Sequence, residues 1–194
     1  MTTMETLLGL CLGVGLSAAC GLRVFIPLLC LSVASHLGLV PLADSFQWIA
    51  TPPAMVALIA ATFVEVTAYF VPWLDNALDS IAGPAAVLAG TIITASQLDQ
   101  LHPLLQWSLA LIAGGGAAGM VQSATTFLRG ASSMATGGLA NPLLATAELG
   151  GALAGSVVSL LFPILAAFVL FTGLLAIIIR LRRRQTRRAP APAA

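Results

Sequence analysis

Long apolar stretches, each about the length of a membrane-spanning helix, recur along the chain. A helix needs about 20 predominantly apolar residues to cross the hydrocarbon core of a bilayer. Stretches close to or above that length lie at 4–22, 54–71, 104–128 and 142–162. Charged residues make up only 8% of the chain, against about 25% in soluble domains. The sequence therefore predicts an all-α integral membrane protein that is surrounded by the lipid bilayer and has no nucleic acid among its partners.

The number of crossings depends on how the apolar sequence around Arg23 is divided. If residues 4–40 form one bent or broken element, the chain has about six transmembrane helices, whereas a hairpin at Arg23 makes seven. Six of the eight basic residues, all arginines, lie in the C-terminal segment 180–188, and the positive-inside rule places such a segment in the cytoplasm. With six crossings the N-terminus lies there too. We therefore predict a multi-pass protein of the plasma (inner) membrane with both termini cytoplasmic.

An internal similarity relates the two halves of the chain. The segments GVGLSAACGLR and GMVQSATTFLR match in 5 of 11 positions at an offset of 106, which aligns Arg23 with Arg129. Three spans in each repeat make an odd number, so the second repeat enters the bilayer in the opposite orientation. We therefore predict a 3+3 inverted repeat of residues 4–96 and 104–180, with a break or re-entrant segment after the first helix of each repeat. A chance similarity within an ordinary helical bundle is the alternative.

The same pattern predicts the domain organisation. Residues 1–182 form one transmembrane domain, and the arginine- and proline-rich residues 183–194 form a cytoplasmic tail that we expect to be disordered. The small size of 19.8 kDa and the glycine-rich helices also favour association into a homodimer. Within the domain, the glycine-rich run 114–119 lacks the lysine of a phosphate-binding loop and indicates close helix packing through small residues.

Four charged residues interrupt the apolar stretches at predicted membrane depth: Arg23, Glu65, Arg129 and Glu148. A lone charge at the bilayer centre costs about 2.5 to 3.5 kcal/mol on the mildest scale, so such residues persist when they are paired, hydrated or used. One interpretation is static ion pairs that lock the helix packing, or arginines that snorkel to the headgroups. The other is a charged site along a central pathway, where arginines attract an anion or a headgroup phosphate and glutamates take up a cation or a proton.

Arg23 itself is expected to be more than a surface anchor. Pro27, four residues further on, removes one backbone hydrogen bond from a continuing helix and frees a carbonyl nearby. Each proposed repeat also supplies one glutamate at membrane depth with no other evident partner. We therefore predict that Arg23 lies at a helix break, and that Glu65 or Glu148 lies within salt-bridge distance of Arg23 or Arg129.

Two further groups of polar residues are candidates for the same pathway. The segment after Arg129 contains glycines and a proline that break a helix, and its polar side chains would line a re-entrant loop: Ser132, Ser133, Thr136 and Asn141. A flexible loop at the cytoplasmic surface is the alternative. Asp75 and Asp79, four residues apart and hence on one helical face, are secondary candidates for holding a cation, although a solvated connector explains them as well.

The sequence lacks the residue patterns of an enzyme or a metal site. The cysteines Cys11, Cys20 and Cys30 lie in apolar sequence without a CxxC pattern, and His36 and His102 are isolated near the ends of apolar stretches. No nucleophile with a neighbouring base and no zinc-ligand spacing can be assembled from the chain. We therefore predict no enzymatic activity, no cofactor and no bound metal.

Three motifs give the chain a resemblance to a known family. The first is GLR-x-F-x-P, formed by Gly21, Leu22, Arg23, Phe25 and Pro27. The second is a glutamate followed by a proline and two aspartates: Glu65, Pro72, Asp75 and Asp79. The third is an arginine, a TGG-x-x-NP segment and a glutamate: Arg129, Thr136, Gly137, Gly138, Asn141, Pro142 and Glu148. In these motifs the chain resembles the small polytopic membrane proteins of domain of unknown function 4126, which implies a fold and candidate positions but no activity.

The pattern favours a small permease or channel-like transporter of an unidentified solute or ion, with its site between the two repeats. A structural or assembly factor of a membrane complex that transports nothing is the first alternative, and a lipid-handling protein is the second. A permease requires a polar cavity that contains the charged residues, whereas an assembly factor would be dry and packed there. A lipid-handling protein would have a groove open sideways to the bilayer.

Overall fold

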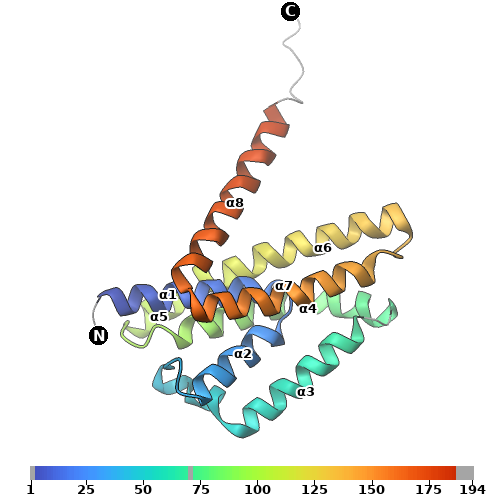
Figure 1. Ribbon diagram of the computed structural model, residues 1–194. Helices are drawn as coiled ribbons and strands as arrows, with labels where there is room; N and C mark the ends of the chain where they lie inside the picture. Colours follow the sequence, from blue (N-terminus) through green and yellow to red (C-terminus); the bar gives the residue numbers. More distant parts are fainter. Residues whose placement is uncertain (1–2, 70–71, 187–194) are drawn as a thin grey trace, which may run out of the picture.

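The computed structural model describes residues 3–69 and 72–186, which form helices and turns without a strand. Figure 1 shows most of the helices lying side by side as a bundle, from which the last one projects. In chain order the elements are α1 (Thr3–Cys20), α2 (Phe25–His36), the 3-10 helix η1 (Asp44–Ala50), α3 (Pro52–Ala68), α4 (Pro72–Ser96), α5 (Pro103–Leu109), the π-helical turn η2 (Ala110–Gly115), α6 (Gly116–Thr136), α7 (Asn141–Leu161) and α8 (Pro163–Thr186). The predicted all-α class is therefore confirmed.

Prolines set where five of these helices begin. Each of the five has a proline within its first two residues: Pro52, Pro72, Pro103, Pro142 and Pro163. Proline lacks an N–H and has a fixed φ, and both properties suit the first turn of a helix, where backbone donors have no intrahelical acceptor in any case. The sequence therefore specifies these helix starts locally, independently of tertiary contacts.

In the described part of the chain, two helical stretches are long and apolar enough to cross a membrane. One is residues 103–136, which joins α5, η2 and α6 into a single run, and the other is α7. The pair η1 and α3, bent by 61°, adds a third if it counts as one span, and shorter apolar helices make up the remainder, among them α1 and α2. Apolar helices of this kind indicate a membrane-embedded protein, as the composition predicted.

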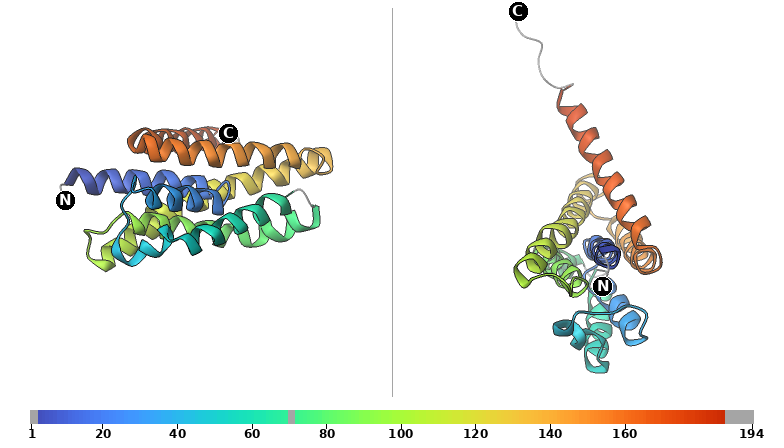
Figure 2. Two further views of the ribbon diagram at one scale, coloured as in Figure 1. Left: turned by 60° about the horizontal axis from the view of Figure 1, so that its bottom comes forward. Right: turned by 90° about the vertical axis from the view of Figure 1, so that its left-hand side faces the viewer.

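The centre of the bundle is α1, with α4, α6, α7 and α8 around it (Figure 2, right). Leu12 and Leu16 of α1 are buried in one apolar cluster with Ile93 of α4. Ser17 Oγ donates a hydrogen bond of 2.7 Å to Gly90 O in the same helix pair. Helices in lipid associate through close van der Waals packing and hydrogen bonds rather than through a hydrophobic effect between them, and both contributions are present along α1.

Small residues allow α4 and the π-helical turn η2 to approach closely. Gly90 faces Gly114, and a Cβ added at Gly90 would lie 2.8 Å from Gly114 O. Gly115 is similarly confined, because a Cβ there would lie 2.6 Å from Thr91 Oγ1. The packing role predicted for the glycine-rich run is therefore confirmed at these positions, although nothing lies within 4 Å of a Cβ on Gly116.

The chain turns back on itself between α1 and α2, so residues 4–40 form a hairpin rather than one bent element. Gly9, near the start of α1, packs against Gln97 at the end of α4. Ala43, which follows α2, donates from its N–H to Ser96 O at 2.9 Å and therefore lies at that same end. The single-element interpretation that led to six crossings is corrected by this turn, and the hairpin alternative is the arrangement found.

α1 and α6, the first helices of the two proposed repeats, run in the same direction. Gly13 and Gly114 both lie against Thr94, and further along both helices Thr125 Oγ1 donates to Gly21 O at 3.5 Å. An inverted repeat requires these two helices to be antiparallel, so the predicted 3+3 inverted repeat is wrong. The physical reason is the turn after α1, which gives the first half four α-helices and returns the chain to its starting orientation before α6.

α6 continues through Arg129 and Gly130 to Thr136, so the break predicted after the second arginine lies further along the chain. A single glycine within a helix costs only about 1 kcal/mol relative to alanine, which neighbouring helix formers offset. The helix ends instead at Gly137 and Gly138, whose φ angles of 64° and 87° lie in the left-handed region. Glycine adopts this conformation readily and commonly terminates helices for that reason.

α8 projects away from the other helices toward the C-terminus (Figure 1; Figure 2, right). Its first residues are joined to α7 at Phe162, and the helix continues through Thr186. The first residues of the predicted tail, 183–186, lie within α8, and the expectation of a disordered tail stays a prediction. The rest of the predicted tail, 187–194, lies outside the described residues.

Candidate functional site

The turn between α1 and α2 brings the first backbone amides of α2 to the side chain of Glu65 in α3. Val24 N donates to Glu65 Oε1 at 2.7 Å, and Phe25 N donates to Glu65 Oε2 at 3.1 Å. The first amides of a helix have no intrahelical acceptor, and the helix N-terminus carries a partial positive charge. Glu65, which is 5% exposed, therefore acts as a cap of α2 supplied by a neighbouring helix.

The end of α1 lies directly against α6. Gly21 approaches that helix so closely that a Cβ added there would lie 2.8 Å from Gln122 N. A residue with a side chain would push the two helices apart, so glycine is required at this contact. Arg23 N still donates to Ala19 O at 3.1 Å across the turn. The turn places the Arg23 side chain, only 2% exposed, beside α7.

α6 and α7 form a hairpin that pairs Arg129 with Glu148. Arg129 Nε donates to Glu148 Oε1 at 3.0 Å, and Arg129 Nη2 donates to Oε2 of the same carboxylate. Two parallel N–H···O bonds make this a bidentate pair, which adds geometric specificity to a charge-assisted hydrogen bond. Arg129 is 5% exposed and the Glu148 side chain 11%, so the pair is shielded from solvent.

Glu148 also contacts Arg23, so one carboxylate serves two arginines. Arg23 Nη2 lies 3.4 Å from Glu148 Oε2 and donates to Ala145 O at 2.9 Å. The ring of Tyr69 contacts both guanidinium groups, with its centroid 3.6 Å from Arg23 Cζ and 4.3 Å from Arg129 Cζ. Cations over an aromatic face are attracted by the ring quadrupole. We call these residues the charge cluster: Arg23, Glu65, Tyr69, Arg129 and Glu148.

The prediction that Arg23 lies at a helix break and is held by an acid is confirmed, and Glu148 is that acid. The expectation of one glutamate for each arginine is not met. Both oxygens of Glu65 accept from backbone amides, so this carboxylate stabilises the helix break rather than forming a second arginine–glutamate pair. Burial explains the difference, because the amides at the start of α2 need an acceptor as much as a buried cation does.

Sequence reasoning missed Tyr69 and the backbone carbonyl of Ala145. Tyr69 is the single tyrosine of the chain and lies four residues after Glu65, a spacing that places two side chains on one helical face. This spacing was an available signal for Tyr69. The carbonyl of Ala145 had no signal in the sequence, since every residue carries one and only the packing of α7 selects it.

The polar residues predicted to line a re-entrant loop stabilise the turn between α6 and α7 instead. Thr136 Oγ1 donates to Ser132 O at 2.8 Å, and Asn141 Nδ2 donates to Ser133 Oγ at 3.1 Å. Ser133 and Thr136 are exposed, and none of the four has a contact with the charge cluster among the hydrogen bonds described. The predicted re-entrant loop is therefore the tip of a helical hairpin.

The two aspartates predicted as secondary cation ligands are placed only by their backbone. Asp75 and Asp79 lie in the first two turns of α4. Their side chains lie outside the described part of the structure, so the prediction that they hold a cation stays a prediction. Isolated histidines have structural contacts: His36 Nδ1 lies 2.9 Å from Ala50 O, and His102 Nδ1 accepts from Leu104 N at the start of α5.

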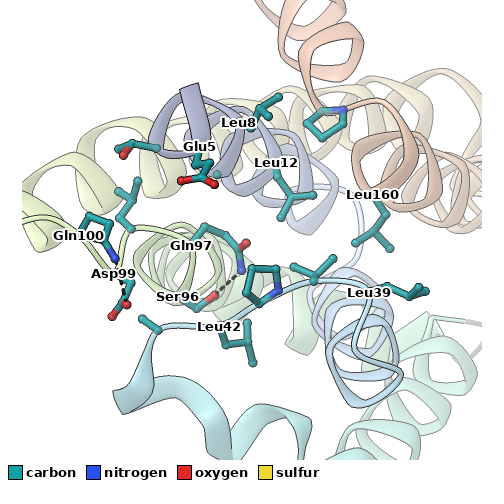
Figure 3. Close-up of a pocket in the computed structure, with 17 residues that line it drawn as sticks. Glu5, Leu8, Leu12, Leu39, Leu42, Ser96, Gln97, Asp99, Gln100 and Leu160 are labelled. Atoms are coloured by element: carbon teal, nitrogen blue, oxygen red, sulfur yellow. Dashed lines mark hydrogen bonds between the residues drawn. The ribbon is translucent and has the colours of Figure 1, made fainter. Parts of the chain in front are cut away.

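A cavity of about 400 Å³ opens at the end of the bundle opposite the charge cluster (Figure 3). Its polar lining comes from the start of α1 and the end of α4, including Glu5, Gln97 and Asp99, and its apolar lining includes Leu12 and Leu160. A second, apolar recess of about 480 Å³ lies against the start of α8. None of the five residues of the charge cluster lines either of these two cavities.

The described part of the chain does not bring together three histidine, cysteine, aspartate or glutamate side chains that could hold a metal ion. All three cysteines are free thiols. Cys20 is buried at the end of α1, where its Sγ lies 3.6 Å from Val24 O across the turn. A buried free cysteine commonly behaves as a small apolar residue with a weak donor, and here it supports the same turn as Glu65.

A bundle of apolar helices around a buried, paired set of charges indicates a membrane-embedded protein of the all-α class. The sequence profile of the family described as domain of unknown function (DUF4126) matches residues 10–184. The chain therefore belongs to this family, as the resemblance of its three motifs indicated. No curated protein and no solved structure matches the chain.

Proposed function

We propose that the chain is a small membrane permease or channel-like transporter of a solute or an ion, with the charge cluster as its site. The observation that supports this most is the helix break at Arg23, where two arginines and two glutamates converge with each side chain at most 11% exposed. Ionisable groups inside apolar helices are costly and commonly mark substrate or ion pathways. Broken helices supply binding groups in many transporters.

The charge cluster lies between the two halves of the chain, which suits a site that changes access. The first half supplies Arg23, Glu65 and Tyr69, whereas the second half supplies Arg129 and Glu148. Arg129 holds both oxygens of Glu148, while Arg23 contacts one of them at the longer distance of 3.4 Å. A substrate that binds Arg23 would loosen the weaker contact first, which shifts the balance between arrangements of the two halves.

The proposed orientation places the arginine-rich end of α8 in the cytoplasm, by the positive-inside rule. α8 begins at the cavity end of the bundle, where Glu5 and Pro163 line the same cavity. If α8 crosses the membrane once, the cavity and the N-terminus face the other side. This revises the prediction of two cytoplasmic termini, and reporter fusions at both ends would test it. Two cytoplasmic reporters would restore the six-crossing topology.

Flux through the reconstituted protein tests the permease. The purified full chain in liposomes should carry ions or small solutes faster than protein-free liposomes do, and Glu148→Gln should lower that flux at least tenfold. Asp99→Asn, an exposed carboxylate at the cavity end, is the matched control and should keep the flux. Folded wild-type protein that carries none of the common inorganic ions or small neutral solutes would contradict the proposal.

An assembly factor of a membrane complex is the second candidate, and one observation favours it. The charge cluster is paired and packed, and neither described cavity reaches it. Under this alternative the liposomes show no flux, while the full chain purifies in mild detergent with a fixed membrane partner. A lipid-handling role is less favoured, because it needs arginines open to headgroups and these are 2% and 5% exposed.

A further inference from the structure

The guanidinium group of Arg23 has hydrogen-bond donors that no described residue uses. Its Nη2 donates to Ala145 O and lies near Glu148 Oε2. Its Nε and Nη1 are buried and have no hydrogen-bond partner among the residues that the structure describes. Since a guanidinium has five N–H bonds, one on Nε and two on each terminal nitrogen, three of them point at no acceptor in a side chain that is 2% exposed.

Unpaired donors on a buried cation require an acceptor. Buried polar groups are nearly always hydrogen-bonded, and a charged group without partners is especially unfavourable. Among the described residues, the two carboxylates of the charge cluster are already engaged, because Glu148 is held in a bidentate pair by Arg129 and Glu65 accepts from two amides of α2. The positive charge of Arg23 is therefore less compensated than that of Arg129. The groups that Arg23 leaves unused are all hydrogen-bond donors.

We propose that Arg23 binds a small monovalent anion at Nε and Nη1, which names the substrate class of the permease proposed above and rests on that function. The N–H groups on Nε and Nη1 can only donate hydrogen bonds, so they bind an acceptor and offer no ligand to a cation. Size limits the anion as well, because neither described cavity extends to the cluster and Arg23 is only 2% exposed, which favours a small ion. Chloride has a suitable charge and radius and is the probe.

Chloride binding is measured on the purified full chain in detergent. Gluconate replaces chloride at constant ionic strength, so only the identity of the anion changes. The midpoint of thermal unfolding should rise by about 5 °C as chloride reaches about 100 times its Kd, and it should keep rising with the logarithm of the chloride concentration. Exchange of sodium for potassium should leave the midpoint unchanged. A midpoint that responds equally to chloride and gluconate would overturn the anion site.

Variants assign the effect to Arg23. Arg23→Gln should abolish the chloride-dependent rise, while Arg180→Gln, an exposed arginine of α8, is the matched control and should keep it. Arg23→Lys keeps the charge but loses the planar donor set, so chloride should bind at least tenfold more weakly. A full rise in Arg23→Gln would overturn the assignment. If that variant does not fold, the chloride-against-gluconate comparison on the unaltered chain decides.

Chloride flux separates this inference from the permease itself. Chloride-specific, Arg23-dependent stabilisation together with chloride efflux from liposomes supports both. Chloride-specific stabilisation without flux supports the anion site and contradicts the permease. Flux of a cation or a neutral solute with no chloride-dependent stabilisation supports the permease and overturns the anion site.

Discussion

The two arginines that align in the sequence occupy different backbone and have different partners. Arg23 follows the end of α1 at a turn, whereas Arg129 lies within α6, which continues to Thr136. Arg129 holds Glu148 through two hydrogen bonds, whereas Arg23 contacts the same carboxylate at 3.4 Å and keeps unpaired donors. Two similar motifs therefore hold one arginine, Arg129, whose guanidinium is paired with a carboxylate, and one, Arg23, whose guanidinium has donors left for a ligand.

The residues around each arginine explain the difference in backbone. At the offset of 106, Gly21 aligns with Phe127 and Pro27 aligns with Ser133. Gly21 lets the end of α1 touch α6, and Pro27 fits the first turn of α2, where its missing N–H is not needed. Phe127 is 76% exposed and requires neither a close helix contact nor a new helix start, so α6 continues as a helix.

Removing the carboxylate of Glu148, which both arginines contact, should have the largest effect on the stability of the protein. Glu148→Ala removes the carboxylate that contacts both arginines, and loss of one partner of a buried pair costs about 3 to 5 kcal/mol. We expect the free energy of unfolding in detergent to fall by that amount. Asp99→Ala, at the exposed end of the bundle, is the control and should change it by less than about 0.5 kcal/mol. A loss below about 1 kcal/mol for Glu148→Ala would show that the pairs are not buried together.

Double-mutant cycles should separate the two arginines. The Arg129→Ala and Glu148→Ala pair should show an interaction energy of about 2 to 3 kcal/mol, because both hydrogen bonds of a bidentate contact are lost. The Arg23→Ala and Glu148→Ala pair should show about 1 kcal/mol or less. Unfolding in detergent gives both values. Equal coupling energies would mean that Glu148 does not prefer Arg129, and additive losses in both cycles would refute the pairing.

A methyl group on Gly21 should destabilise the helix break. The added Cβ of Gly21→Ala would lie 2.8 Å from Gln122 N, and overpacking of this kind typically costs about 1 to 3 kcal/mol. Thermal unfolding in detergent measures the loss. Gly83→Ala, where nothing lies within 4 Å of the new atom, is the matched control. An unchanged stability for Gly21→Ala would indicate that α1 and α6 are further apart than the structure has them.

The smallest effect is expected at Gly130, and its sign is opposite. Gly130 lies within α6 and a Cβ there would meet nothing within 4 Å. Gly130→Ala should therefore raise the free energy of unfolding by about 0.4 to 1 kcal/mol, since alanine loses less conformational entropy in a helix. A decrease would indicate that the chain leaves the helix after Arg129, as the sequence alone had predicted.

Much of the site was accessible from the sequence, because charges stand out in an apolar chain. Arg23, Arg129 and Glu148 were identified as a group from their cost in lipid alone, and they meet in the structure. Glu65 was identified as well, but its role as a cap of α2 was not, because no local pattern shows which helix start a distant carboxylate reaches. The segment around Ser132 forms a hairpin tip rather than a re-entrant loop, because glycine and serine are typical of both, and its place in a pathway stays a prediction.

The sequence by itself determined that the chain is helical and apolar, where most helices begin, and which charges need partners. These properties depend on transfer free energies and on proline geometry, which act residue by residue. Only the tertiary structure decided that the chain turns at Arg23, that α1 and α6 run in parallel, and that one glutamate serves two arginines. Apolar length carries no information on direction, and the sharing of a buried carboxylate depends on distances across helices that local sequence does not encode.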